Sequence, residues 1–359
     1  MDEQFIQSLR TLAPGTLLRE GLDNVLRART GGLVVIGDTS QIMELVDGGF
    51  RPDLEFLPSR LYELAKMDGA IILSRDTKRI LYANVQLNPD PNIPSFETGI
   101  RHRTAERIGK QTAAMVIAIS QRRNVITFYQ GTTRYVLRDQ SVILNKANQA
   151  LQTLEKFRMA LDQSLANLTA LELEDLVTVG DVVTCLQRFE MVRRVIRELD
   201  LFIAELGKEG RLVSLQTAEL AGNVTEEALL LLQDYGEDGG VVWARMMQAK
   251  LATWSSEALL DVQALAQALG LGMALDASLA PRGYRVLHKI PRLPPPVVEN
   301  LLRVFGYLPR VLMASIEEMD EVEGVGEMRA RYIKEGLRRL REAALLGKDF
   351  IASFNPMVL

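Results

Sequence analysis

Short apolar blocks alternate with polar turns along the first 140 residues of the chain. Apolar runs that lack a helical period and end at glycine or polar residues predict buried strands. Such runs occupy 33–36, 70–73, 80–87, 113–119, 125–129 and 134–137. Apolar residues spaced by three or four predict helices over 9–26 (broken by Pro14-Gly15), 58–67 and 104–111. Strands joined by short turns, with helices between them, indicate an α/β domain in which flanking helices cover a mixed sheet.

The pattern becomes purely helical after residue 140. One apolar stripe follows a long predicted helix, because its members recur every three or four positions. The stripe consists of Leu151, Leu154, Phe157, Leu161, Leu165 and Leu168. The polar faces of this region mix acidic, basic and amide side chains, which favours packing against protein over binding to a membrane surface. We therefore expect a helical spine, or linker domain, over 141–290.

A proline-rich stretch over 281–296 marks a stiff boundary, because proline presets an extended backbone. Short helices are predicted beyond it, over 297–305, 309–314 and 315–320, and a last helix runs from 327 to about 344. The sequence thus predicts a multidomain chain, α/β followed by all-α. Its expected domains are 1–140, 141–290 and 291–359.

Composition narrows the chemistry that the chain can perform. Of its 359 residues 47% are hydrophobic and 25% charged, which is typical of folded proteins. One cysteine, Cys185, excludes an intrachain disulfide, and two histidines, His102 and His288, leave too few ligands for the usual zinc sites. A metal would be held by carboxylates, which favours Mg²⁺ or Mn²⁺. We expect Cys185 and His288 to be structural. The chain shows no apolar stretch long enough to span a bilayer and no signal peptide, so we expect a cytoplasmic protein.

Charge is distributed unevenly, with a basic C-terminal end on an acidic body. Residues 281–359 carry 13 Lys and Arg against 10 Asp and Glu, and the rest of the chain carries 29 against 36. Within this end, Gly324-Val325-Gly326 permits a tight turn whose amides can bind phosphates at the start of a cationic helix. The pattern resembles the helix-hairpin-helix module, which binds the DNA backbone without reading sequence; the alternative is a plain turn with a solvated basic face. The expected DNA contacts are Gly324, Val325, Gly326, Arg329, Arg331 and Lys334.

Two clusters in the α/β region carry candidate chemistry. Asp68-Gly69-Ala70 places a carboxylate at the edge of a predicted strand, where the glycine lets a metal or phosphate approach, although most Asp-Gly pairs are simple turns. Gly99–Thr104 places two arginines and an imidazole just before a predicted helix, and Thr104 can cap that helix or add a hydroxyl. Because arginine binds phosphate bidentately, the second cluster favours a polyphosphate; the alternative is a solvated basic turn.

Two common nucleotide-binding motifs are missing from the sequence. Gly109-Lys110 lacks the hydroxyl residue and the upstream glycine of a P-loop, and no Gly-x-Gly-x-x-Gly follows a predicted strand. A P-loop NTPase and a Rossmann dinucleotide site are therefore disfavoured.

Asp68-Gly69-Ala70, followed by Gly99–Glu106 with its Arg-His-Arg core, resembles the paired DGA and RHR motifs of bacterial diadenylate cyclases. The resemblance extends over nearly the whole chain, because members of this family also combine a helical middle with a C-terminal helix-hairpin-helix. It implies the diadenylate cyclase fold for the first domain. The implied reaction condenses two ATP molecules into cyclic di-AMP and releases two pyrophosphates.

The resemblance also implies roles for individual residues. Asp68 would hold the divalent metal and help to activate the 3′-hydroxyl, Gly69 would lie against the nucleotide, and Leu87 would contact the adenine. The phosphates would be bound by Arg101, His102, Arg103 and Thr104, with Ser120 as a further phosphate ligand. Ile100 stands where the family commonly has threonine, so any ATP contact there would come from its backbone. Catalysis would fall to Asp68, Arg101, His102 and Arg103.

The implied partners follow from the chemistry. One site that holds one ATP cannot supply both reactants, so the resemblance implies that protomers pair face to face, within a homo-octamer. It further implies that branched DNA, such as a Holliday junction, binds the C-terminal module and inhibits the cyclase, which suggests a cytoplasmic protein at the nucleoid with a role in DNA damage and repair. Two alternatives stay open: a DNA-binding scaffold that senses nucleotides without turnover, and a DNA-processing nuclease or helicase. The missing P-loop and the lack of an acidic nuclease cluster weigh against the second.

Overall fold

The computed structural model describes residues 3–237 and 239–352, with the backbone alone for 345–352. The chain divides into two compact units. The first takes in the chain up to Gln149 together with Leu199–Leu215, and the second takes in Ala150–Glu198 and the chain from Gln216 onward. The division into three domains stays a prediction, and the end of the third expected domain, 353–359, lies outside the described residues.

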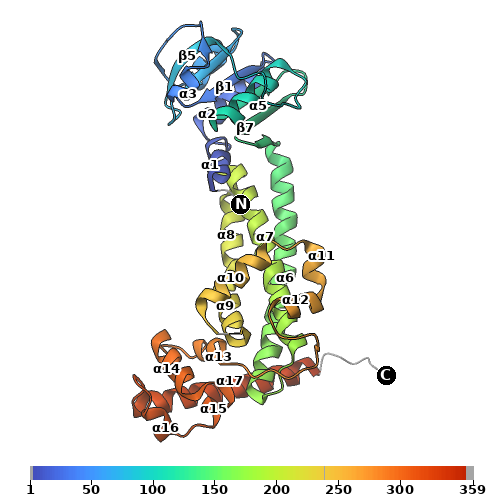
Figure 1. Cartoon of the computed structure of the whole chain (residues 1–359), viewed down its shortest axis with the longest axis vertical. Coiled ribbons are helices and arrows are strands. Elements are labelled where there is room, and N and C mark those ends of the chain that lie inside the picture. The colour runs from blue at the N-terminus through green and yellow to red at the C-terminus, as the bar shows by residue number, and fades with distance from the viewer. Residues whose placement is uncertain (1–2, 238, 353–359) are drawn as a thin grey trace, which may run out of the picture. The chain divides into compact units, whose positions relative to one another are not determined.

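The first unit contains an eight-stranded sheet, and its mixed character agrees with the sequence prediction, although β2 and β3 were not predicted. Its strands run in the order β2-β5-β4-β1-β6-β7-β8, and β3 pairs with β5. Figure 1 labels β1, β5 and β7 of this sheet together with helices α2, α3 and α5. The central pair β1–β4 is parallel, whereas β1–β6, β4–β5 and β6–β7 are antiparallel. The strands are β1 (Gly32–Ile36), β2 (Val46–Asp47), β3 (Leu54–Glu55), β4 (Ala70–Leu73), β5 (Arg79–Leu87), β6 (Met115–Ser120), β7 (Val125–Gln130) and β8 (Thr133–Val136).

Helices cover both faces of this sheet, which explains why its central strands are apolar throughout. Side chains alternate between the faces of a strand, so Val34 and Ile36 of β1 enter one core with residues of α1, α2 and α4. Leu33 and Val35 enter the other core, with residues of α3 and α5. The helices that precede residue 140 in this unit are α1 (Glu3–Thr11), α2 (Leu17–Arg27), α3 (Ser40–Met43), α4 (Pro58–Leu64) and α5 (Ile100–Thr112).

From residue 140 to 352 the described chain forms helices joined by turns and loops, and its β pairing is a single bridge between Thr178 and Ser278. The apolar stripe predicted for the first long helix is buried along α6, except for Phe157, which is half-buried. None of the described helices has the length and apolar character that crossing a bilayer requires. In order, the helices are α6 (Gln140–Glu174), α7 (Val179–Leu206), η1 (Gly207–Gly210), α8 (Arg211–Ala221), α9 (Val224–Tyr235), α10 (Val241–Ala252), α11 (Ser256–Leu260), α12 (Val262–Ala268) and α13 (Tyr284–His288), then α14 (Pro295–Phe305), α15 (Leu308–Met313), α16 (Ile316–Asp320) and α17 (Glu327–Ala352).

The C-terminal helices of the second unit share one apolar core, to which Val298, Met319 and Ile333 contribute. Ser315 begins α16 through a capping box with Glu318. The predicted turn is present between α16 and α17, and Gly324 adopts the left-handed backbone that a tight turn needs, with φ +83°. The two helices and the turn between them are therefore present, and the assignment as a helix-hairpin-helix module stays a prediction.

A buried cluster of polar side chains joins α13 to α6 and α9 within the second unit. Arg285 pairs with Glu172, which also accepts a hydrogen bond of 2.8 Å from the hydroxyl of Tyr235. The carboxylate of Asp234 accepts the backbone N–H groups of Gly283, Tyr284 and Arg285 at 2.6–3.0 Å. The start of α13 is thereby fixed to α9 through a buried carboxylate.

Candidate functional site

A cavity of about 570 Å³ lies in the first unit, where β4 and α5 begin. Its size falls within the range of small-molecule sites. Strand β5 supplies another wall, and Leu33 of β1 forms part of the floor. The cavity brings together six of the residues predicted from the sequence, namely Asp68, Gly69, Leu87, Ile100, Arg101 and Thr104.

Asp68 reaches this cavity because Gly69 lets the chain turn sharply into β4. Gly69 has φ +97°, and a Cβ there would lie 2.8 Å from the carbonyl oxygen of Val85, so only glycine fits. The side chain of Asp68 is fully exposed, and its Oδ1 lies 3.4 Å from Nη2 of Arg101. A solvated carboxylate with one cationic neighbour can still accept a hydroxyl or a metal through its remaining lone pairs.

Helix α5 begins four residues earlier than predicted, and this corrects the expected role of Thr104 as a cap. Gly99 is the residue before the first turn, and its carbonyl accepts the N–H of Arg103 at 2.9 Å. Thr104 therefore lies in the second turn, and its side chain lines the cavity instead. The sequence missed this start because Gly99 makes no side-chain cap and the Arg-His-Arg segment has no apolar period.

Because successive residues of a helix point about 100° apart, the first turn of α5 sends its three basic side chains in different directions. Arg101 lines the cavity and lies above Gly31, where a Cβ would come within 2.5 Å of its Nη1. Arg103 is exposed, and its Nε donates to the carbonyl oxygen of Glu97 at 3.4 Å. His102 is buried. The phosphate-binding roles of His102 and Arg103 stay predictions, since neither residue lines the cavity.

Ser120 ends β6 and also lies outside the cavity wall. It is half-buried, and its hydroxyl accepts the backbone N–H of Arg123 at 3.2 Å. This bond shapes the turn between β6 and β7. The phosphate contact expected of Ser120 stays a prediction.

A buried polar cluster that the sequence did not single out surrounds His102. Glu97, in the loop before α5, accepts hydrogen bonds from the hydroxyl of Tyr129 at 2.8 Å and from Nε of Arg134 at 2.6 Å. The ring of His102 meets that of Tyr129 edge-on, with 6.4 Å between centroids, and its Nε2 is buried without a partner in the described chain. A buried ring nitrogen left without a partner is costly, which marks it as a position for a ligand or water.

Burial and charge act in opposite directions on this cluster. Burial lowers the pKa of His102, and the carboxylate of Glu97 counteracts part of that shift. Burial alone would raise the pKa of Glu97, but the hydrogen bonds from Arg134 and Tyr129 outweigh it and lower the pKa. Glu97 is therefore a stable anion that compensates the cations around it.

The loop before α5 is fastened to that helix at several points. Arg107 donates to the carbonyl oxygens of Ile93 and Pro91, each at 2.9 Å. The carboxylate of Glu106 accepts the hydroxyl of Ser95 at 2.5 Å and pairs with Lys110 at 2.7 Å. These bonds hold the loop, and thus Glu97, in a fixed position beside the first turn of α5.

The carboxylate of the site can hold a divalent metal only when a substrate supplies further ligands. Within the described residues, no group of three or more His, Cys, Asp or Glu side chains is arranged to hold a metal ion. Mg²⁺ commonly takes one or two carboxylates and completes its shell with phosphate oxygens and water. Asp68 alone fits that pattern, provided that a nucleotide supplies the other ligands.

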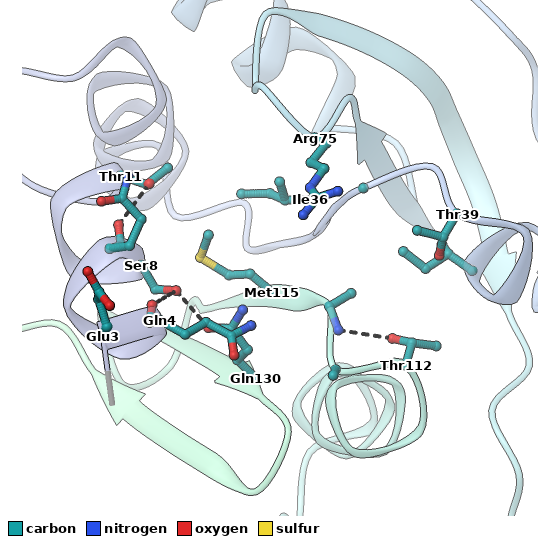
Figure 2. A pocket seen from close by; sticks show the side chains of 15 residues that line it. Glu3, Gln4, Ser8, Thr11, Ile36, Thr39, Arg75, Thr112, Met115 and Gln130 are labelled. Carbon is teal, nitrogen blue, oxygen red and sulfur yellow. Dashed lines mark hydrogen bonds between the residues drawn. The ribbon is translucent and has the colours of Figure 1, made fainter. Parts of the chain in front are cut away.

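A second cavity, of about 680 Å³, lies at the opposite end of β1. Figure 2 shows its wall, where the hydroxyl of Ser8 donates to Oε1 of Gln130 at 2.6 Å. Arg75 and Thr112 also line it, but none of the residues predicted for the site does so. Its wall also contains a carboxylate, Glu3, and an arginine, Arg75, but the described contacts include no ion pair between them, whereas Asp68 and Arg101 lie 3.4 Å apart in the first cavity.

The predicted DNA contacts in the second unit are partly engaged within the protein. Arg331 pairs with Glu327 at 2.5 Å, Lys334 donates to the carbonyl oxygen of Leu312 at 2.8 Å, and Arg329 donates to that of Gly324. Val325 is buried, and its N–H donates to Val322 at 2.8 Å. The structure thus assigns Val325 an anchoring role in the turn, and the DNA contacts stay predictions.

Comparisons with known proteins cover most of the chain. A family model described as the DisA bacterial checkpoint controller nucleotide-binding region matches residues 19–134, and one described as the DisA bacterial checkpoint controller linker region matches 137–278. DNA integrity scanning protein DisA of Carboxydothermus hydrogenoformans is 60% identical over 95% of this chain and 98% of that protein. The protein of the same name from Symbiobacterium thermophilum is 57% identical over 94% and 96%. Among solved structures, a double mutant of DacA from Staphylococcus aureus aligns with a TM-score of 0.30 and 20% identity over 35% of this chain and 89% of that chain.

Proposed function

Since this chain belongs to the DNA integrity scanning protein DisA family and is a diadenylate cyclase that makes cyclic di-AMP from ATP, we propose that two copies work with their ATP cavities face to face. The observation that carries the proposal is the single cavity that joins Asp68 to Arg101. One such cavity holds one ATP, and the reaction consumes two. Family membership sets aside the two alternatives that the sequence left open.

In the proposed reaction, each 3′-hydroxyl oxygen attacks the α-phosphorus of the opposite ATP. A new P–O bond forms at each ribose, the bond from the α-phosphorus to the leaving oxygen breaks, and two pyrophosphates depart. The hydroxyl protons pass to Asp68 or to solvent. Catalysis of this kind depends mainly on positioning and on compensation of phosphate charge.

The residues of the cavity divide these tasks. Asp68 accepts the 3′-hydroxyl, and Arg101 binds phosphate oxygens, for which its guanidinium has matched donors. Leu87 offers an apolar surface to the adenine, while Gly69 and the backbone of Ile100 allow close approach of the nucleotide. Around the first turn of α5 and the end of β6, the proposed phosphate ligands are His102, Arg103, Thr104 and Ser120.

We also propose that Asp68 contributes one ligand to a bound Mg²⁺ or Mn²⁺ ion, with phosphate oxygens as further ligands. Such an ion compensates the negative charge of the triphosphate when it is bound. The exposure of the Asp68 side chain supports this assignment, because the carboxylate is accessible from the cavity side.

The variant Asp68→Asn tests the role of the carboxylate. We expect the yield of cyclic di-AMP to fall by about 100-fold or more, because the general base and metal ligand are both lost. The melting temperature should not change, since the side chain is fully exposed. Product is measured by mass spectrometry after incubation with ATP and Mn²⁺ or Mg²⁺, and Asp38→Asn, on the surface after β1, serves as the control. Wild-type turnover by Asp68→Asn would remove Asp68 from the mechanism.

We further propose that the C-terminal hairpin binds branched DNA, that bound DNA inhibits the cyclase, and that the protein acts as a homo-octamer at the nucleoid. The tight turn at Gly324 and the exposed guanidinium of Arg331 support the DNA contact. Arg331→Gln should weaken DNA binding and reduce its dependence on salt concentration, because one phosphate contact is lost. Holliday-junction DNA should lower the rate of cyclic di-AMP synthesis more than linear duplex does; an unchanged rate would reject the inhibition.

A further inference from the structure

We propose that Glu97 is a positioning residue of the cyclase site and that it acts through His102. Glu97 does not line the ATP cavity, and it lies in the loop that leads into α5. Its carboxylate accepts hydrogen bonds from side chains of two strands, and one of them, Tyr129, packs against the imidazole of His102. The proposal rests on the proposed contact of His102 with the ATP phosphates and adds a residue that governs that contact.

The first argument is geometric. The carboxylate of Glu97 is held by Tyr129 of β7 and Arg134 of β8, which are neighbours across the two strands. Tyr129 in turn lies edge-on to the ring of His102. Because Glu97 and Tyr129 are both buried, a change in one carboxylate reaches the imidazole through a packed ring and not through solvent.

The second argument is electrostatic. The charged groups that face His102 are Arg101 of α5, Arg123 of the β6–β7 turn, Arg134 of β8 and Glu97 itself. The three arginines all disfavour a cationic imidazole, and Glu97 is the anion that opposes them. The same carboxylate lies 3.9 Å from Nη1 of Arg123. The charge of Glu97 therefore reduces the positive potential around the unpartnered Nε2 atom of His102.

A second glutamate of the same segment provides a matched control. Glu106 is buried to the same degree as Glu97, at 8% against 9% exposure, and it also fastens the loop before α5. It pairs with Lys110, and the charges that act most strongly on His102 do not include it. A purely structural role for Glu97 would make the two residues equivalent.

The test measures the pKa of His102 in full-length Glu97→Gln, Glu106→Gln and wild-type protein. Hydrogen–deuterium exchange at the imidazole C2 position, followed by mass spectrometry, reads each histidine separately, and the chain has only two. We expect Glu97→Gln to lower the pKa of His102, because glutamine keeps the shape but removes the compensating charge. Glu106→Gln should leave it unchanged, and His288 is the internal reference.

Cyclase activity provides the second readout on the same three proteins. Glu97→Gln should reduce kcat/KM for ATP by about tenfold or more, and Glu106→Gln should reduce it by much less. Tyr129→Phe, which keeps the ring but removes the hydroxyl, should give an intermediate loss and covers the case in which Glu97→Gln folds poorly. Equal effects of the two glutamate variants on His102 and on turnover would overturn the proposal. An inactive wild type, by contrast, would refute the proposed function and leave the His102 measurement interpretable.

Discussion

Two polar clusters, one in each unit, are built from the same three side-chain types and differ mainly in exposure. In the first unit Glu97 accepts a hydrogen bond of 2.8 Å from Tyr129 and pairs with Arg134, whose side chain is 46% exposed. In the second, Glu172 accepts a hydrogen bond of 2.8 Å from Tyr235 and pairs with Arg285, which is 3% exposed. A fully enclosed arginine can only stabilise the fold, whereas a half-exposed arginine can also bind a ligand.

The difference extends to the atoms left without partners and to charge. Beside Glu97, the imidazole of His102 has a buried nitrogen, Nε2, without a partner in the described chain. Beside Glu172, burial raises the pKa of Asp234 to about 7, although three backbone N–H groups and Arg285 favour its anion. The first cluster keeps a negative charge among exposed cations, and the second holds its charges where water cannot compensate them. We infer that the cluster around Glu97 contributes to binding and that the cluster around Glu172 contributes to rigidity.

The largest effect is expected from Arg285→Met. Removing the cation leaves Glu172 buried without its partner, so the second unit should lose about 3–5 kcal/mol of stability. Thermal unfolding followed by circular dichroism measures the loss. Arg338→Met removes an exposed arginine from ion pairs on α17 and should leave the melting temperature unchanged. Similar melting temperatures for the two variants would show that the enclosed cluster is not a stabilising element.

The same substitution in both clusters gives a smaller and sharper contrast. Tyr235→Phe should cost about 1–3 kcal/mol of stability, because Glu172 loses a buried donor, and should leave cyclase activity intact. Tyr129→Phe should cost about 1 kcal/mol or less, because the exposed Arg134 and water can compensate Glu97, but should lower cyclase activity. Chemical denaturation measures the stability of both variants, and product assays measure their cyclase activity. A larger loss of stability in Tyr129→Phe, or a loss of activity in Tyr235→Phe alone, would contradict the assignment of the two clusters.

A pH dependence of opposite sign in the two units gives a further contrast. The pKa of Asp234 is raised, so its contribution to stability is lost as pH rises from about 4 towards about 7. The pKa of Glu97 is lowered, so its contribution is lost as pH falls through that pKa. Relative to Asp234→Asn, the wild type should therefore lose a few °C in melting temperature with rising pH, and relative to Glu97→Gln it should lose stability with falling pH. If the melting temperatures of wild type and a variant changed in parallel with pH, the pKa shift assigned to the substituted residue would be wrong.

Sequence patterns predicted most of the sheet because its strands are long apolar runs. The runs at 33–36 and 70–73 correspond to β1 and β4 almost residue for residue. By contrast β2 and β3 have two residues each, of which one is acidic, so they carry no periodic signal. The start of α5 was misplaced for a similar reason, since Gly99 offers no capping side chain and the basic segment after it is not apolar.

The candidate site was predicted in part. Asp68 and Arg101 were identified from their motifs, and the structure brings them to one cavity. Glu97 was missed because its partners Tyr129 and Arg134 are 32 and 37 positions away, and only the pairing of β7 with β8 beside α5 brings them together. Local spacing contains no information on such a contact. The different directions of Arg101, His102 and Arg103 likewise depend on where the helix begins.

Gly31 illustrates how a residue without chemistry can restrict a site. It has φ +73°, and a Cβ would come within 2.5 Å of the guanidinium of Arg101. In a saturation mutagenesis library, every replacement at Gly31 would displace the arginine above it, and even alanine would be depleted. Selection at such a position would report both on the left-handed backbone of Gly31 and on the space that the neighbouring Arg101 occupies.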